Sequence, residues 1–283
     1  MADDLQDSGN THDNDDAPQD GGKEMSFWQH FDELRGVLFR IAILVIGLAI
    51  AAFCVMRPVF DNVILAPCSA DFPTYSLLGF IRGDGDFMPD LGNGDFSVSL
   101  MTINLGSQFM THLSSSLWLA ATVAFPLILW MLWRYVAPAL YDNERRPARR
   151  AFLSGLALFY IGVAVGYFLV FPLALRFLSQ YQLSPGIAVN LTLDSYMDTF
   201  YMILLAMGII FEIPVLAWML GKIGLLKRSF FSRYRRHAIV VCAATAAIVT
   251  PTSDVFTLVL VFIPIYGLWE LSALLVPRPS PDD

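Results

Sequence analysis

Acidic residues within or beside long apolar stretches are the side chains of this sequence best suited to binding or proton chemistry. Glu212 lies deep inside one such stretch, in the motif FEIP. A carboxylate in lipid is costly, so such residues usually face protein, water or a ligand. We therefore favour a functional role for Glu212 over a protonated glutamate that hydrogen-bonds a neighbouring helix. Glu270 lies nearer a helix end, where a carboxylate at the membrane interface explains it equally well.

Two further glutamates, Glu33 and Glu144, lie beside arginines at the edges of apolar stretches. Two carboxylates held close together can bind two guanidinium groups through bidentate, charge-assisted hydrogen bonds. Spacing alone favours a simpler interpretation, in which Glu144 pairs with Arg145 or Arg146 and Glu33 pairs with an exposed basic neighbour. A binding role for both glutamates is thus a hypothesis that spacing alone does not establish.

Asp254 follows the tight turn TPTS, and either Ser253 or Asp254 is predicted to cap the next helix. The sequence shows no paired histidines, nucleophile motif or phosphate-binding glycine loop, so we expect no metal, no cofactor and no enzymatic activity. The three cysteines lie far apart and indicate neither a disulfide framework nor a metal site. Nothing in the sequence suggests binding to nucleic acid.

The composition is that of a polytopic membrane protein. Hydrophobic residues make up 56% of the 283 residues, charged residues only 15%, and the mean hydropathy is +0.57. The net charge of −7 comes from residues 1–25, where eight acids face a single lysine. This segment is too polar to bury anything and is predicted to be a disordered cytoplasmic tail. Residues 277–283 are predicted to form a short cytoplasmic tail at the other end.

The membrane domain is predicted to cover residues 26–276 as an all-α bundle of six spans with short fifth and sixth helices. An amphipathic helix over residues 26–35 is expected to lie in the membrane interface before them. Prolines inside four spans indicate kinked helices and a cupped wall, unless they only reflect the general frequency of proline in membrane helices. The expected spans are 36–56, 109–133, 151–175, 199–221, 238–250 and 255–274, with prolines at Pro126, Pro172, Pro214 and Pro264.

The distribution of basic residues predicts the orientation. Arginines and lysines gather after the second and fourth spans, whereas the other loops carry only Arg57, Arg82 and Arg176. Because loops rich in Lys and Arg stay in the cytoplasm, both termini are predicted to be cytoplasmic and residues 57–107 to form a long periplasmic cap loop. The bases that decide this are Arg145, Arg146, Arg149, Arg150, Lys222, Lys227, Arg228, Arg233, Arg235 and Arg236.

Six motifs occur in order along the whole predicted membrane domain. They are HFDELRGVL (30–38), APALYDNERR (137–146), FYIGVAVGYFLVFPLAL (159–175), FEIP (211–214), TPTSDVFT (250–257) and IPIYGLWE (263–270). Taken together, they resemble TatC, the polytopic subunit of the twin-arginine protein translocase. The chain departs from the family pattern at Val37, where a second base is common, and at Leu258, where a polar residue is common.

The resemblance implies a role for each matching residue. Glu33 and Glu144 match the acidic residues that recognise paired arginines, and Arg35 and Tyr135 match their neighbours. Glu212 matches the glutamate that faces the concave groove of a cup-shaped fold. The residues expected at the outer face or in partner docking are Pro67, Thr250, Asp254 and Thr257.

The function implied is that of a receptor for twin-arginine signal peptides and a scaffold for exporting folded proteins. The expected location is the cytoplasmic (inner) membrane of a bacterium. TatA-type and TatB-type single-span proteins are the expected partners, with self-association in the receptor complex and the proton gradient as energy source. The rival is a proton-coupled secondary transporter that uses Glu212, although such folds usually show internal repeats, and we find none.

Overall fold

The computed structural model of the protein describes residues 27–75, 97–136, 142–181, 184, 190–222, 224–250 and 254–276. For residues 27–31, 136 and 142–150 it describes the backbone alone.

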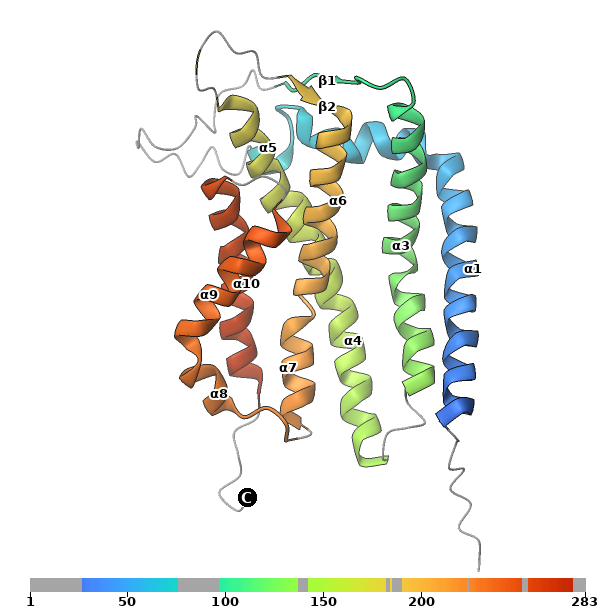
Figure 1. The fold of residues 1–283 in the computed structure, drawn as a ribbon, viewed down its shortest axis with the longest axis vertical. Helices are drawn as coiled ribbons and strands as arrows, with labels where there is room; N and C mark the ends of the chain where they lie inside the picture. The colour runs from blue at the N-terminus through green and yellow to red at the C-terminus, as the bar shows by residue number, and fades with distance from the viewer. Residues whose placement is uncertain are drawn as a thin grey trace, which may run out of the picture.

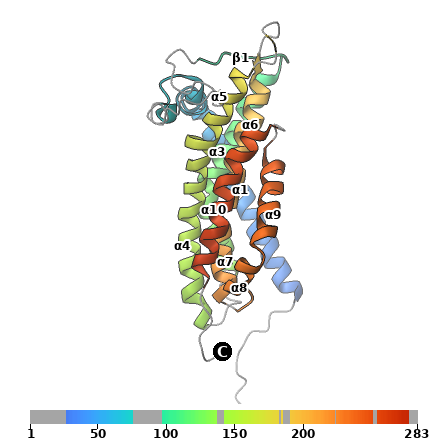
Figure 2. The same cartoon turned by 90° about the vertical axis from the view of Figure 1, so that its left-hand side faces the viewer.

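Long helices stand side by side in one layer that is broad in Figure 1 and thin in Figure 2. In Figure 2, α9 and the start of α1 lie on the same side of α4, so the layer is curved into a cup. We call the end where α1 begins and α10 ends the lower end, and the opposite end the upper end (Figure 1). The helices are α1 (Phe27–Val59), α3 (Ser107–Val136), α4 (Asp142–Val165), α5 (Phe171–Gln180), α6 (Leu193–Ile210), α7 (Ile213–Lys222), α8 (Arg228–Arg233), α9 (Arg235–Val249) and α10 (Val255–Leu275).

Short elements cover the upper end of the layer. After α1 come a π-helical turn, η1 (Phe60–Ile64), and a 3-10 turn, η2 (Ala66–Cys68). Strand β1 (Leu100–Met101) pairs in parallel with β2 (Leu191–Thr192), which joins the segment before α3 to the segment before α6.

The core of the protein lies along α4, α5 and α6. Glycines allow α4 and α6 to approach so closely that their backbones nearly touch. A methyl group on Gly162 would lie 2.5 Å from the carbonyl oxygen of Met207, and one on Gly208 would lie 2.7 Å from the Phe159 ring. Side chains that are 0% exposed continue this core, namely Val170, Ala174, Ile203, Met207, Ala246 and Val261.

Two polar side chains at the upper end, Tyr75 and Arg176, are buried and contact each other. The Tyr75 hydroxyl donates to the carbonyl oxygens of Pro67, at 2.8 Å, and Pro172, at 3.2 Å. The Arg176 guanidinium, only 2% exposed, lies 5.1 Å from the centre of the Tyr75 ring. Burial raises the pKa of Tyr75, so this hydroxyl stays protonated as a donor. Arg176 was expected in a loop but lies in α5. Its contact with Tyr75 joins the short elements of the upper end to α5.

Five helical segments are long and apolar enough to cross a membrane, and they match the predicted spans one to four and six. The predicted fifth span corresponds to α9, which has 15 residues and is not among those five. At 1.5 Å per residue α9 is about 22 Å long, short of a hydrocarbon core of about 30 Å. The count of six spans therefore stays a prediction.

The separate interfacial helix predicted for residues 26–35 is wrong. These residues from Phe27 onward are the first turns of α1, one continuous helix of 33 residues. No helix breaker separates the amphipathic start from the apolar part that follows, since Gly36 costs a helix only about 1 kcal/mol. The pattern of side chains changes at Gly36, but the helical conformation of the backbone continues.

Two of the predicted kink positions coincide with breaks in regular helix. Pro172 follows the π-helical turn η4 (Gly166–Val170), and Pro214 follows a turn at residues 211–212 that separates α6 from α7. Each proline lacks a backbone N–H and crowds the preceding turn, which favours such irregular geometry. Pro126 and Pro264 instead lie within the unbroken helices α3 and α10.

Candidate functional site

The lower ends of α1 and α3 enclose a cleft of about 700 Å³, which we call the α1–α3 cleft. On each helix its lining residues recur every three or four positions, so they share one face of the helix. The cleft has both a charged and an apolar part. Its lining residues are Asp32, Glu33, Gly36, Val37 and Arg40 from α1, and Trp130, Met131, Arg134 and Tyr135 from α3.

Four charged side chains face this cleft without neutralising one another. Asp32, Glu33, Arg40 and Arg134 make no ion pair and no hydrogen bond with any residue that the structure describes. All four are exposed, so none of them is enclosed by protein. Carboxylates and guanidinium groups in this state are available to a ligand that offers complementary charges.

The structure brings two of the four predicted recognition residues together, Glu33 and Tyr135. Arg35 does not line the cleft, and its guanidinium lies 5.6 Å from the centre of the exposed Phe39 ring on its own helix. Glu144 lies in the first turn of α4, at the same lower end as the cleft (Figure 1). Its side chain, and the predicted contact with Arg145 or Arg146, lie outside the described residues.

Glu212 occupies the turn between α6 and α7, against α4. A methyl group on Gly155 would lie 2.7 Å from its Oε2 atom, so the missing side chain of Gly155 makes the room for this carboxylate. Oε1 is buried and has no hydrogen-bond partner among the described residues. Glu212 thus makes no hydrogen bond to a described neighbouring helix through Oε1, and its functional role stays a prediction.

The four residues expected at the outer face all lie at the upper end of the layer. Asp254 caps α10, because its Oδ1 accepts from the backbone N–H of Thr257 at 2.6 Å, which confirms the predicted cap. Thr250 donates to the carbonyl oxygen of Ala246 at 3.0 Å. Asp254 Oδ2 and Thr257 Oγ1 are buried and make no hydrogen bond with a described residue. Pro67 is buried in η2 beneath Tyr75.

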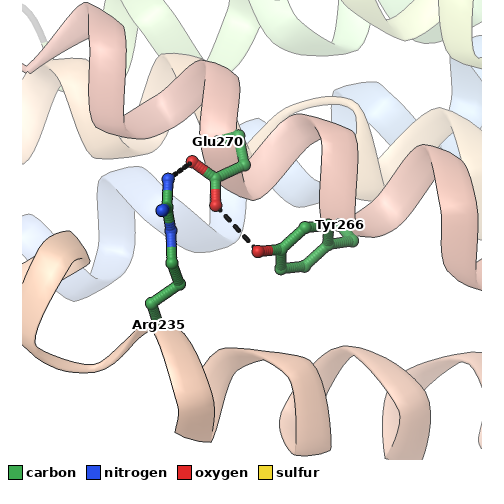
Figure 3. Close-up of polar contacts among 3 residues, drawn as sticks. All are labelled: Arg235, Tyr266 and Glu270. Carbon is green, nitrogen blue, oxygen red and sulfur yellow. Dashed lines mark hydrogen bonds and ion pairs between the residues drawn. The ribbon is translucent and has the colours of Figure 1, made fainter.

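Glu270 belongs to an ion pair rather than to a pocket. Its Oε2 lies 2.6 Å from a guanidinium nitrogen of Arg235, and its Oε1 accepts from the Tyr266 hydroxyl at 2.9 Å (Figure 3). The hydrogen bond to Glu270 raises the pKa of Arg235. This contact joins the start of α9 to the lower part of α10, and it agrees with the interpretation of Glu270 as a carboxylate near a helix end.

Comparison with known proteins identifies the family. The family model described as Sec-independent protein translocase protein (TatC) matches residues 29–264. The chain belongs to the TatC family. It is therefore a component of a Sec-independent protein translocase, a multi-pass membrane protein with a transport function rather than a catalytic one.

Relatives and solved structures agree with this assignment. The TatC of Campylobacter jejuni is 30% identical over 256 residues, which is 90% of this chain and 95% of the relative. The TatC of Helicobacter pylori is 37% identical over 166 residues, 58% of this chain and 65% of the relative. A crystal structure named as the twin-arginine translocase receptor TatC aligns with a TM-score of 0.66 at 30% identity, covering 87% of this chain and 97% of that one.

The cleft also contains residues that the sequence did not point to. These lining residues are Asp32, Arg40, Trp130 and Arg134. A helical-face argument from Glu33 would have reached Gly36, Val37 and Arg40. No signal in one sequence indicates that the face carrying Trp130 and Arg134 on α3 would lie opposite them.

Proposed function

We propose that this protein is the receptor for twin-arginine signal peptides and the scaffold of a translocase that exports folded proteins. The observation that carries the proposal is the α1–α3 cleft, which both Glu33 and Tyr135 line and in which no described residue neutralises the Glu33 carboxylate. The resemblance to a solved twin-arginine translocase receptor supports it.

In this proposal the paired arginines of a signal peptide bind at the lower end of the layer. One guanidinium binds Glu33, and the second binds Glu144 from the start of α4. Bidentate, charge-assisted hydrogen bonds to carboxylates give such a site its preference for arginine over lysine. The Tyr135 ring offers a surface on which a guanidinium can stack. Arg35, which lies outside the cleft, is assigned to its rim.

Two arginines cannot cross lipid cheaply, so they hold the peptide at the membrane surface. The apolar part of the signal peptide then extends along the concave face toward Glu212. Single-span partners of the TatA and TatB type dock where α9 and α10 approach the upper end, at Thr250, Asp254 and Thr257, and several copies of this chain assemble. The transmembrane proton gradient supplies the energy.

The proposed orientation puts the lower end and both termini in the cytoplasm of a bacterial inner membrane. The arginines in the first turns of α4 support this, because segments rich in arginine stay on the cytoplasmic side. In a variant without native cysteines, a cysteine at Arg82 should react with a membrane-impermeant reagent from outside the cell, and one at Arg146 only after lysis. Reaction of both from one side contradicts the orientation.

The experiment for recognition is an export assay with a reporter that carries a twin-arginine signal. Glu144→Lys and Glu33→Lys should each abolish export, since each places a positive charge where an arginine must bind. The matched control is Asp198→Lys, which reverses an exposed carboxylate on α6 at the opposite end of the layer. Membrane levels of all three variants are measured by immunoblot.

Undiminished export in Glu33→Lys and Glu144→Lys, at normal membrane levels, excludes the recognition role. Glu212→Gln separates the rival function. A transporter would lose a small-solute flux in this variant while export continued, whereas the proposed receptor would lose export.

A further inference from the structure

The charges of the α1–α3 cleft also fit a second kind of ligand. Two carboxylates and two guanidinium groups line it, so the cleft is neutral in sum but strongly polar. None of the four is paired with another described residue. A ligand that satisfies all four must itself carry both a positive and a negative group.

The opposite charges lie at different depths along α1. Arg40 follows Glu33 by seven residues, which is about 10 Å along the helix axis. No charged residue occurs between Arg40 and Arg57, a stretch of about 25 Å. With both arginine side chains extended outward, this length fits a hydrocarbon core of about 30 Å. Arg40 therefore marks the edge of the hydrocarbon, and Asp32 and Glu33 lie farther out.

The deep part of the cleft borders on lipid. The apolar residues around Arg40 on α1 are largely exposed, with Leu38 at 54%, Phe39 at 58% and Ile43 at 69%. Trp130, which lines the cleft on α3, is 51% exposed. Tryptophan is enriched at this depth because its ring favours the headgroup region. A lipid of the surrounding leaflet thus reaches the cleft without leaving the membrane.

We propose that the α1–α3 cleft binds the headgroup of phosphatidylethanolamine. Its phosphate accepts hydrogen bonds from Arg40, with Arg134 as a second donor, and its ammonium group donates to Asp32 and Glu33. The order of charges in this lipid, phosphate next to the acyl chains and ammonium toward water, is the order of Arg40 and the two carboxylates along α1. A purely anionic headgroup satisfies the arginines but is repelled by the two carboxylates.

This inference adds a ligand to the cleft and does not need a signal peptide to be present. It is tested by native mass spectrometry of the full-length protein in detergent, titrated with phosphatidylethanolamine, phosphatidylcholine or phosphatidylglycerol of matched acyl chains. Phosphatidylcholine has the same charges, but its methylated nitrogen donates no hydrogen bond. Loss of charge-assisted hydrogen bonds lowers affinity by about tenfold or more. We expect phosphatidylethanolamine to bind most tightly by that factor.

Variants assign the binding to the cleft. Arg40→Gln should weaken phosphatidylethanolamine binding by about tenfold. Asp32→Asn should remove the preference over phosphatidylcholine. The control is Arg236→Gln, which removes an exposed arginine at the lower end that does not line the cleft. Circular dichroism and gel filtration check that each variant is folded.

Equal binding of the three lipids, a preference for phosphatidylglycerol, or unchanged binding in Arg40→Gln would overturn the inference. Because the titration contains no peptide, its failure leaves the receptor proposal untouched. In the same way, loss of the receptor role would not alter the lipid titration.

Discussion

The helix pairs α1–α3 and α4–α6 differ in how much of their surface is buried and in how closely their glycines approach a neighbouring helix. In the most apolar part of the first span only 6% of residues are buried, against 39% in the segments that contain α4 and α6. Gly36 and Gly47 on α1 have no atom within 4 Å of where a methyl group would stand, whereas Gly162 on α4 nearly touches the α6 backbone. Small residues thus bring α4 and α6 together, while α1 is a peripheral helix.

The polar groups follow the same division. At the upper end, Tyr75 and Arg176 are buried and paired within the protein, so they stabilise the fold. In the α1–α3 cleft, charged groups are exposed and lack protein partners. A polar group whose hydrogen bonds are made within the protein stabilises the fold. A polar group without a protein partner can still form hydrogen bonds or ion pairs with a ligand. The comparison therefore separates polar residues that stabilise the fold from charged residues that we propose bind a ligand.

The strongest test of this difference in packing adds one methyl group to α4 and, separately, one to α1. Gly162→Ala forces α4 away from the α6 backbone and should destabilise the protein by about 3 kcal/mol, as overpacking does in a rigid core. Gly47→Ala, on α1, should change stability by about 1 kcal/mol or less, because the methyl group meets nothing. Thermal unfolding in detergent measures both. Equal losses would mean that α1 is packed as tightly as α4.

The second prediction concerns charge in the cleft. Glu33→Gln keeps the shape of the side chain but removes its charge, so affinity for a twin-arginine peptide should fall about tenfold or more. The melting temperature should stay unchanged, since Glu33 has no partner among the described residues. Fluorescence anisotropy with a labelled peptide measures the affinity, and Asp198→Asn is the matched control. A lowered melting temperature with unchanged affinity would make Glu33 a structural residue.

A smaller effect on stability is expected at Gly155. A methyl group there meets the end of the Glu212 side chain rather than backbone, and that side chain can turn away. Gly155→Ala should therefore cost about 1 kcal/mol or less. Export of the reporter should nevertheless fall if Glu212 acts from its present position. Normal export with a displaced carboxylate would remove Glu212 from the mechanism.

The smallest effect is expected at the ion pair of Arg235 and Glu270. Both side chains are accessible, at 62% and 31%, and exposed pairs contribute little because water and salt screen them. A double-mutant cycle with Arg235→Gln and Glu270→Gln should show a coupling near zero in thermal unfolding. A large coupling would mean that this contact stabilises the fold, as the buried polar contacts of the upper end do.

Local patterns in the sequence predicted local features well. The helix cap at Asp254 follows from a short polar residue after a tight turn, and five of the predicted spans follow from apolar runs. The continuity of α1 was missed, because an amphipathic stretch and an apolar stretch differ in pattern even when one backbone hydrogen-bond ladder joins them. The π-helical turns at residues 60–64 and 166–170 carry no signal in composition.

The cleft could be predicted only in part. Glu33 and Tyr135 were reached through the family motifs, but their neighbours Arg40, Trp130 and Arg134 depend on how α1 and α3 rotate against each other. Likewise, Arg176 reads as a loop base in the sequence and is a buried partner of Tyr75 in the fold. Contacts between residues about 100 positions apart are set by packing, which one sequence does not display.

The central claim is that the α1–α3 cleft itself receives the paired arginines. Its most direct test is photocrosslinking from an unnatural residue at Val37, inside the cleft, compared with one at Gly106, exposed at the upper end. A signal peptide with adjacent arginines should crosslink at Val37 but not at Gly106, and replacing both arginines by glutamine should abolish the product. A crosslink at Val37 that persists when both arginines are replaced would contradict the account. So would the absence of a crosslink at Val37 while the peptide remains bound to the protein.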